Sequence, residues 1–203
     1  MSYKAIIISS DDLKKTIPDY LPSKASEFHE LSARMADKQF KNMLVETSRP
    51  KVILMNGGSA SGKTEFMVSH LSNKNAIIVD TTLPSIEGAR IKIEKSMKYN
   101  KIVELYSVMP DNLARAFTVF LHRDRIFPAT HFYRTHSNSR MTLLWIARNY
   151  PHIKINIIES QFSEGMDMIF SVIKFKNRNG LIKYLEDIQL SEDAIIKATI
   201  SEG

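Results

Sequence analysis

The residues most able to do chemistry form one continuous stretch, Gly57-Gly58-Ser59-Ala60-Ser61-Gly62-Lys63-Thr64. This stretch matches the pattern G-x-x-x-x-G-K-[ST] of a phosphate-binding loop, in which glycines let several backbone N–H groups face one anion. A helix starting at the loop adds partial positive charge. We expect Lys63 to reach the β- and γ-phosphates of a nucleotide and the Thr64 hydroxyl to bind Mg²⁺. The alternative is an ordinary tight turn before a helix.

Such a loop needs a strand before it and a helix after it, and the sequence offers both. Val52-Ile53-Leu54-Met55 is an apolar run typical of a buried strand, and residues from about 64 to 71 are compatible with a helix. The other predicted strands are residues 4–9, 76–80, 102–108, 153–158 and, as a hairpin partner, 166–176. The other predicted helices are about 24–45, 85–98, 110–121, 129–150, 181–190 and 194–200. Alternating strands and helices predict an α/β fold, a P-loop NTPase/kinase fold whose mainly parallel sheet of about five to six strands carries helices on both faces.

Two of the predicted strands end in acidic residues. Asp11 follows the strand at 4–9, and Asp80 closes the run Ala76-Ile77-Ile78-Val79. Ligand chemistry in α/β proteins gathers at the carboxyl ends of strands, so both aspartates are candidates for a chemical role. Asp80 also resembles the acidic strand end that positions Mg²⁺ in phosphate-loop enzymes. For each aspartate, helix capping is the alternative interpretation.

A phosphate loop serves either a kinase or a nucleotide-hydrolysing switch or motor. A small kinase also needs cations around the transferring phosphoryl group and a carboxylate that accepts the substrate hydroxyl proton. Arg123 and Arg125 lie in a break between helices that has the character of a lid, and Asp11 is the candidate base, with Asp80 as the next candidate. The sequence has no guanine-selective Asn-Lys-x-Asp box, and 203 residues are few for a large motor. A kinase is therefore favoured.

Composition limits the remaining possibilities. The length predicts a single domain, and the absence of cysteine excludes disulfides and thiolate-bound zinc. A net charge of +6 suits an anionic ligand, while the absence of an RNA-binding or helix-turn-helix signature makes nucleic acid an unfavoured partner. No apolar run is long enough for a membrane span or signal peptide, so we expect a cytoplasmic protein without membrane contact. The six histidines are interpreted as scattered surface or partly buried residues rather than as a metal site.

Several blocks of the sequence resemble the zeta toxin family of P-loop kinases. These blocks are Gly57–Thr64, Ala76–Thr82, Arg123–Pro128, Asp11–Tyr20 and His29–Asp37, and the resemblance covers about residues 4–160. Toxin members of that family phosphorylate UDP-N-acetylglucosamine at a sugar hydroxyl. The resemblance therefore implies ATP and Mg²⁺ as cofactors, a small-molecule substrate such as a nucleotide sugar, and a neutralising antitoxin protein as partner.

The resemblance also implies roles for individual residues. It assigns the general base to Asp11 and the phosphate and Mg²⁺ contacts to Lys63 and Thr64. Asp37 and Thr82 match substrate contacts, with Asp80 at the same strand end as Thr82. Arg123 and Arg125 match the phosphate-binding arginines at a compressed spacing. Two alternatives stay open: a kinase acting on another nucleotide, NAD or a nucleic-acid end, and a nucleotide-binding protein without transfer activity.

The order of the blocks departs from the family. There the Asp-x-x-Lys segment follows the phosphate loop, whereas here it precedes the loop, as in a circular permutation. We therefore divide the single domain 1–203 into a relocated substrate-side unit at 1–50, a core with a lid at 51–160 and a C-terminal appendage at 161–203. A parallel sheet tolerates this relocation if Ala5–Ile8 still lies beside Val52–Met55.

Overall fold

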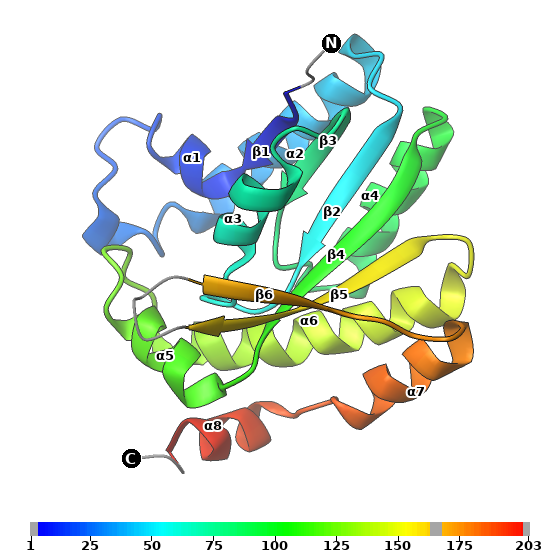
Figure 1. Ribbon diagram of the computed structural model, residues 1–203. Helices are drawn as coiled ribbons and strands as arrows, with labels where there is room; N and C mark the ends of the chain where they lie inside the picture. The colour runs from blue at the N-terminus through cyan, green and yellow to red at the C-terminus, as the bar shows by residue number, and fades with distance from the viewer. Residues whose placement is uncertain (1–3, 163–167, 201–203) are drawn as a thin grey trace.

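A computed structural model describes residues 4–162 and 168–200 of the chain (Figure 1). Within these residues six strands form one sheet in the order β1-β3-β2-β4-β5-β6. The strands are β1 (Ile6–Ser9), β2 (Lys51–Asn56), β3 (Ala76–Asp80), β4 (Ile102–Pro110), β5 (Lys154–Phe162) and β6 (Met168–Ile173). All neighbouring pairs are parallel except β5 with β6. The predicted α/β fold with a mainly parallel sheet is confirmed, as is the hairpin partner, although residues 166 and 167 of that predicted strand lie outside the described part of the chain.

The first strand does not lie beside Val52–Met55, the position in which the relocation would be tolerated. β1 pairs with β3, with Ser9 opposite Asp80, while β2 lies between β3 and β4. Burial explains this order: five of the six β2 residues are buried, whereas Ile6 and Ile7 are only partly buried, which fits an edge strand. The carboxyl ends of β1 and β3 are consequently adjacent.

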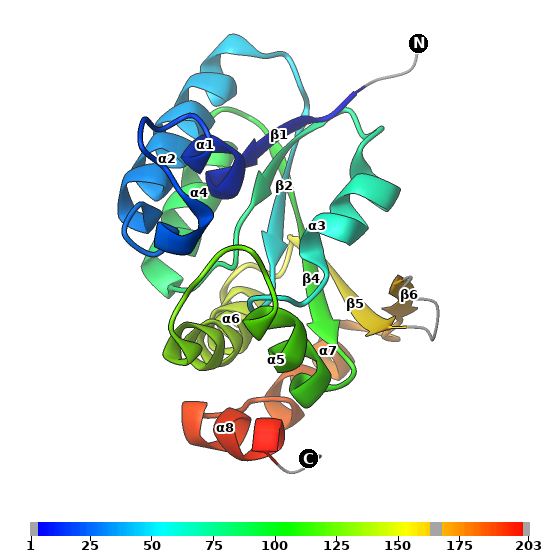
Figure 2. The same cartoon turned by 90° about the vertical axis from the view of Figure 1, so that its left-hand side faces the viewer.

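Helices cover the two faces of the sheet unequally. One face carries α2 (His29–Glu46), α4 (Ile86–Lys98), α6 (Ala129–Asn149) and α7 (Arg178–Asp187), which share the larger apolar core. The other face carries α3 (Lys63–Phe66) and the π-helical turn η2 (Met67–Leu71) that continues it. Figure 2 shows α3 on the side of the sheet opposite α2 and α4. The prediction of helices on both faces of the sheet is confirmed. The helix that follows the phosphate loop, α3, has four residues.

The remaining helices lie near the ends of the strands. They are α1 (Ser10–Lys14), the 3₁₀ turn η1 (Pro22–Lys24), α5 (Leu113–Leu121) and α8 (Glu192–Ile200). Helices α5, α6 and α8 share a small apolar cluster that contains Phe120, Phe132 and Ile195. The predicted break between helices is therefore residues 122–128, between α5 and α6. Its Ile126 N–H donates to the Pro22 carbonyl (3.1 Å), which joins the break to the N-terminal unit.

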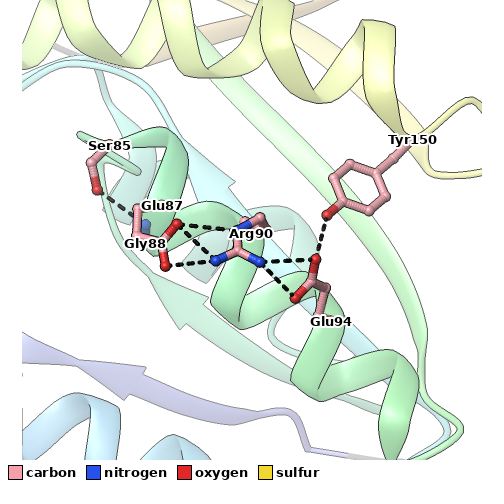
Figure 3. Close-up of polar contacts among 6 residues, drawn as sticks. All are labelled: Ser85, Glu87, Gly88, Arg90, Glu94 and Tyr150. Atoms are coloured by element: carbon pink, nitrogen blue, oxygen red, sulfur yellow. Dashed lines mark hydrogen bonds and ion pairs between the residues drawn. The ribbon is translucent and has the colours of Figure 1, made fainter.

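Helix α4 begins where its sequence predicts. Ser85 is the N-cap, and its hydroxyl accepts a hydrogen bond from the Gly88 N–H (3.1 Å) (Figure 3). Along the exposed side of the helix, Arg90 pairs with Glu87 and Glu94. Glu94 in turn accepts a hydrogen bond from the Tyr150 hydroxyl (3.3 Å), which connects α4 to the end of α6.

Among the described helices, none combines the length and the apolar character needed to span a bilayer. A cytoplasmic location stays a prediction.

Candidate active site

The phosphate-loop pattern lies between the end of β2 and the start of α3. Its backbone takes positive φ at Gly57 (131°), Ala60 (58°) and Gly62 (82°). At Gly57 a Cβ would also lie 2.2 Å from the Val108 carbonyl oxygen, so a side chain there meets both strain and a clash. Strand, curled loop and helix follow one another as the pattern requires.

Lys63 is folded back onto this loop. Its buried ammonium group donates to the carbonyls of Gly57 (2.9 Å) and Gly58 (2.6 Å). Burial lowers the pKa of Lys63 to about 8, and the negative charge of Asp80 opposes that shift. The ammonium group therefore lies within the loop, where phosphate oxygens would compete with these two carbonyls for it.

One cavity of about 510 Å³ brings most of the predicted site residues together. Its lining includes the predicted residues Asp11, Asp37, Ser59, Ala60, Ser61, Gly62, Lys63, Thr64, Asp80, Thr82, Arg123 and Arg125. Gly57 and Gly58 do not line the cavity and contact other elements instead. Residues from five separate stretches of the chain thus meet in one hollow at the carboxyl ends of the strands.

Asp11 is held between two cations. One carboxylate oxygen accepts from the Lys14 ammonium group (3.0 Å), and the other pairs with Arg125, which is 114 positions away in sequence. Asp11 lies in the first turn of α1, whose N-cap is Ser9. The alternative interpretation of Asp11 as a helix cap is therefore wrong, and its side chain remains partly exposed to the cavity.

Asp80 ends β3 beside the phosphate loop. Burial raises the pKa of Asp80, while the Lys63 charge and a 3.5 Å hydrogen bond from the Ser9 hydroxyl oppose the shift. The helix that follows is capped by Ser85, so the capping interpretation of Asp80 is also wrong. The exposed Thr64 hydroxyl at the start of α3 lines the same cavity, and so does Thr82.

The two arginines of the break between α5 and α6 both reach the cavity. Arg123 lies over the Phe120 ring, 4.7 Å from its centroid, and its buried Nε has no hydrogen-bond partner among the described residues. Burial lowers the pKa of both Arg123 and Arg125. Arginine is effectively always protonated in proteins, so both guanidinium groups stay charged at neutral pH.

Asp37 lies at the exposed rim of the cavity. Its carboxylate accepts from the Lys92 ammonium group of α4 (2.6 Å). A substrate that contacted Asp37 would therefore meet this ion pair between α2 and α4 rather than a free carboxylate.

The structure adds cavity residues that the sequence did not single out. Lys14 is almost fully buried, 4.9 Å from the Phe127 ring centroid, and burial lowers its pKa to about 8. His29 and His131 lie with ring centroids 5.5 Å apart, and burial lowers the pKa of His131 to about 4. The Asp-x-x-Lys spacing on one helical turn signalled the Lys14 pair. No sequence signal marked the two histidines.

The interpretation of all six histidines as surface or partly buried residues is wrong for His136. Its ring is fully buried in α6 and contacts the phosphate loop, with Nε2 2.9 Å from the Ser59 carbonyl oxygen. His29 and His131 thus line the cavity, and His136 contacts the phosphate loop.

Neither the protein-family models nor the curated proteins give a match to this sequence. Solved structures do: the native AvrRxo1-ORF1:-ORF2 complex aligns with a TM-score of 0.50 at 13% identity, over 82% of this chain and 73% of that chain. Two others are AvrRxo1-ORF1:AvrRxo1-ORF2 with sulphate ions (TM-score 0.47, 14% identity, 83% and 72% covered) and the ORF1:ORF2 structure with ATP (TM-score 0.47, 13% identity, 82% and 73% covered). At 13% identity, the match to the native complex shows that this chain shares a fold with it. Fold and site together define an α/β protein with a phosphate-loop sequence at the end of its central strand.

Proposed function

We propose that this protein is an ATP-dependent kinase of zeta-toxin type, with a P-loop NTPase fold, that transfers a phosphoryl group to a hydroxyl of a small molecule. One observation carries the proposal: a single cavity is lined by the phosphate-loop residues, by two carboxylates at strand ends and by two arginines from a distant loop. These are the groups that a phosphoryl-transfer site needs, and they come from separate elements. The shared fold of the AvrRxo1-ORF1:-ORF2 complex supports the fold assignment.

The donor half of the site is the loop at 57–64. We propose that its backbone amides and Lys63 hold the phosphates of ATP, with the Lys63 ammonium moving from the Gly57 and Gly58 carbonyls onto the phosphate oxygens. Arg123 is partly buried and takes part in none of the ion pairs found among the described residues, and we propose that it neutralises the transferring group.

The residues around Thr64 fit Mg²⁺. The Thr64 hydroxyl and the Asp80 carboxylate line the same cavity and provide the hard oxygen donors that this ion prefers. Within residues 4–162 and 168–200 no cluster of three or more acidic, histidine or cysteine side chains could bind a metal alone. Nucleotide phosphates and water would therefore complete the coordination, as is usual for Mg²⁺, and the ion would supply charge neutralisation at the β- and γ-phosphates.

The acceptor half is built around Asp11. Both of its carboxylate oxygens are engaged, one by Lys14 and one by Arg125. We propose that Arg125 leaves Asp11 for the phosphoryl group when both substrates are bound, which frees one oxygen to accept the hydroxyl proton. Asp37 and Thr82 are proposed as further substrate contacts.

Asp11→Asn tests the assignment of the base. Loss of a general base typically costs 10²- to 10⁴-fold in rate, so we expect kcat to fall by about that factor. The matched control is Asp12→Asn, because Asp12 is exposed, forms its ion pair within the described chain with Lys15, and does not line the cavity. If Asp11→Asn kept wild-type turnover, Asp80 would become the candidate base.

The acceptor is identified with labelled ATP and a panel of hydroxyl compounds. The panel contains UDP-N-acetylglucosamine, other nucleotides, NAD and a nucleic-acid 5′ end. Transfer to one of them names the substrate. Tight ATP binding without any product across the panel would favour a nucleotide-binding protein that lacks transfer activity.

We also propose a neutralising antitoxin as protein partner. The resemblance to zeta toxins implies one, and the structural neighbour is itself a complex of two proteins, ORF1 and ORF2. Growth after induced expression of the wild type, compared with Lys63→Ala, tests toxicity. Equal growth of both strains would count against a toxin role.

A further inference from the structure

We propose that His136 and Arg140 of α6 are positioning residues that hold the phosphate loop in its present shape. The inference rests on the proposed function for its meaning, because the loop is taken as the ATP site. Neither side chain lines the cavity that is assigned to ATP and the acceptor. Both act through the backbone of the loop.

The peptide groups of Ser59 are held from α6 on both sides. The Ser59 N–H donates to the Thr135 hydroxyl (3.0 Å), and the Ser59 carbonyl accepts from His136 Nε2 (2.9 Å). The Thr135 hydroxyl in turn donates to the Phe132 carbonyl (3.0 Å) in its own helix. The middle of the loop is therefore tied to a 21-residue helix, which is a rigid support.

The chemistry of the contact fixes the form of the imidazole. A carbonyl oxygen can only accept, so His136 Nε2 must carry the proton. In a neutral ring Nδ1 is then an acceptor, and Arg140 is the donor that faces it, with a nitrogen 3.3 Å away. Burial, helped by the Arg140 charge, lowers the pKa of His136 well below its usual value, which agrees with a neutral ring.

Arg140 has a clear reason to be buried beside this histidine. Its guanidinium donates to the His136 carbonyl (2.9 Å) as well as facing Nδ1. The side chain is 6% exposed and takes part in none of the ion pairs found in the described chain. A buried cation is costly unless it is hydrogen-bonded. Arg140 Nε has no hydrogen-bond partner in the described structure, and the hydrogen bonds that the guanidinium does make, to Nδ1 and to the carbonyl of His136, hold the orientation of that ring.

The shape of the loop matches this ring. A Cβ built at Gly58 would lie 2.2 Å from His136 ring carbons, so only glycine lets the loop approach so closely. Gly58 occupies a position that the phosphate-loop pattern leaves free, and the pattern alone does not explain it. The close contact with His136 explains why residue 58 is glycine. It also sets the distance between the loop and α6.

The test compares two substitutions at His136. His136→Leu replaces the imidazole with an apolar side chain of similar size that has no donor, whereas His136→Gln keeps a side-chain N–H donor. We expect His136→Leu to weaken ATP binding roughly tenfold or more, the usual effect of losing a buried hydrogen bond, and His136→Gln to recover much of it. The KM for ATP should rise while the KM for the acceptor changes little. Titration calorimetry with ATP and steady-state kinetics measure these effects.

A second measurement needs no nucleotide. Amide hydrogen exchange should be slow at Ser59 in the wild type and faster in His136→Leu and in Thr135→Val, the latter removing the partner of the Ser59 N–H. Thr142→Val is the matched control, because Thr142 is buried in the same helix and its hydroxyl has no partner in the described structure. Thr142→Val should leave both the exchange rate and the ATP affinity unchanged.

The outcomes separate the two proposals. Unchanged Ser59 exchange, or an ATP affinity within twofold of wild type in His136→Leu, would overturn the positioning role. If the wild type bound no ATP while His136→Leu still loosened Ser59, the positioning of the loop would stand and the kinase proposal would fall. If His136→Leu did not fold, His136→Ala, which also lacks a donor, would take its place in both comparisons.

Discussion

At the scale of single residues, the cavity brings several partly or fully buried cations together. Lys14, Lys63, Arg123 and Arg125 all line it, and burial lowers the pKa of each of them. Mutual repulsion and desolvation make this arrangement costly in the empty protein. An anionic ligand would remove much of that cost.

His131 predicts how stability depends on acid. Its pKa is lowered to about 4, so at pH values between 6.5 and 4 the unfolded chain binds a proton that the folded protein does not. Stability is therefore fully present above pH 6.5 and falls as the pH drops through this window. His131→Phe should remove about 1–2 kcal/mol of the loss between pH 7 and pH 5. Urea unfolding of both proteins across this range measures the difference, and parallel curves would contradict the assignment.

The local chemistry could be predicted from sequence, while its long-range contacts could not. The phosphate loop and Lys63 are recognisable because the pattern lies within eight neighbouring residues. The pair between Asp11 and Arg125 joins residues 114 positions apart, and no local spacing encodes it. Lys14 is buried against Phe127, and His136 is buried against the phosphate loop. Both partners are distant in sequence, so neither burial could be predicted from local spacing.

At the scale of elements, some predicted boundaries agree with the structure, whereas α2 begins at His29 rather than at about 24 and α7 spans Arg178–Asp187 rather than 181–190. Ser85 marks the start of α4, and the strand at Ala76–Asp80 has the bounds that were expected. The order of strands was predicted less well, because a four-residue apolar run such as 5–8 fits beside any parallel neighbour. In the structure β3 and β4 occupy both edges of β2, and β1 pairs with the other edge of β3.

Helix α4 offers a direct test of its N-cap. Ser85→Ala removes the acceptor of the Gly88 N–H and should lower the free energy of unfolding by about 1 kcal/mol. Ser85→Asp keeps a capping oxygen and should stay within a few tenths of a kcal/mol of wild type. Chemical denaturation at neutral pH measures both. Equal stability of the alanine and aspartate variants would show that the cap does not stabilise α4.

At the scale of the whole molecule, ligand binding and stability are linked. If the cavity binds ATP with Mg²⁺ only in the folded state, ATP at 100 times its Kd should stabilise the protein by about 2.7 kcal/mol. For a chain of 203 residues this corresponds to a rise in Tm of about 5–10 °C. Lys63→Ala should lose most of the shift. Lys74→Ala, which changes an exposed lysine outside the cavity, should keep it. A shift of equal size in both variants would contradict the role of Lys63.

The pairing of β1 with β3 has a consequence for how the chain assembles as it is synthesised. In the described sheet β1 has no strand partner other than β3, so residues 6–9 must wait until residues 76–80 have left the ribosome. The ion pair of Asp11 can form only after Arg125 has been synthesised, and the hydrogen bond to the Pro22 carbonyl can form only after Ile126 has been synthesised. The acceptor half of the proposed site is thus translated first and completed late. A nascent chain that ends before residue 122 carries the phosphate loop but not the arginines, and it would be inactive as a kinase.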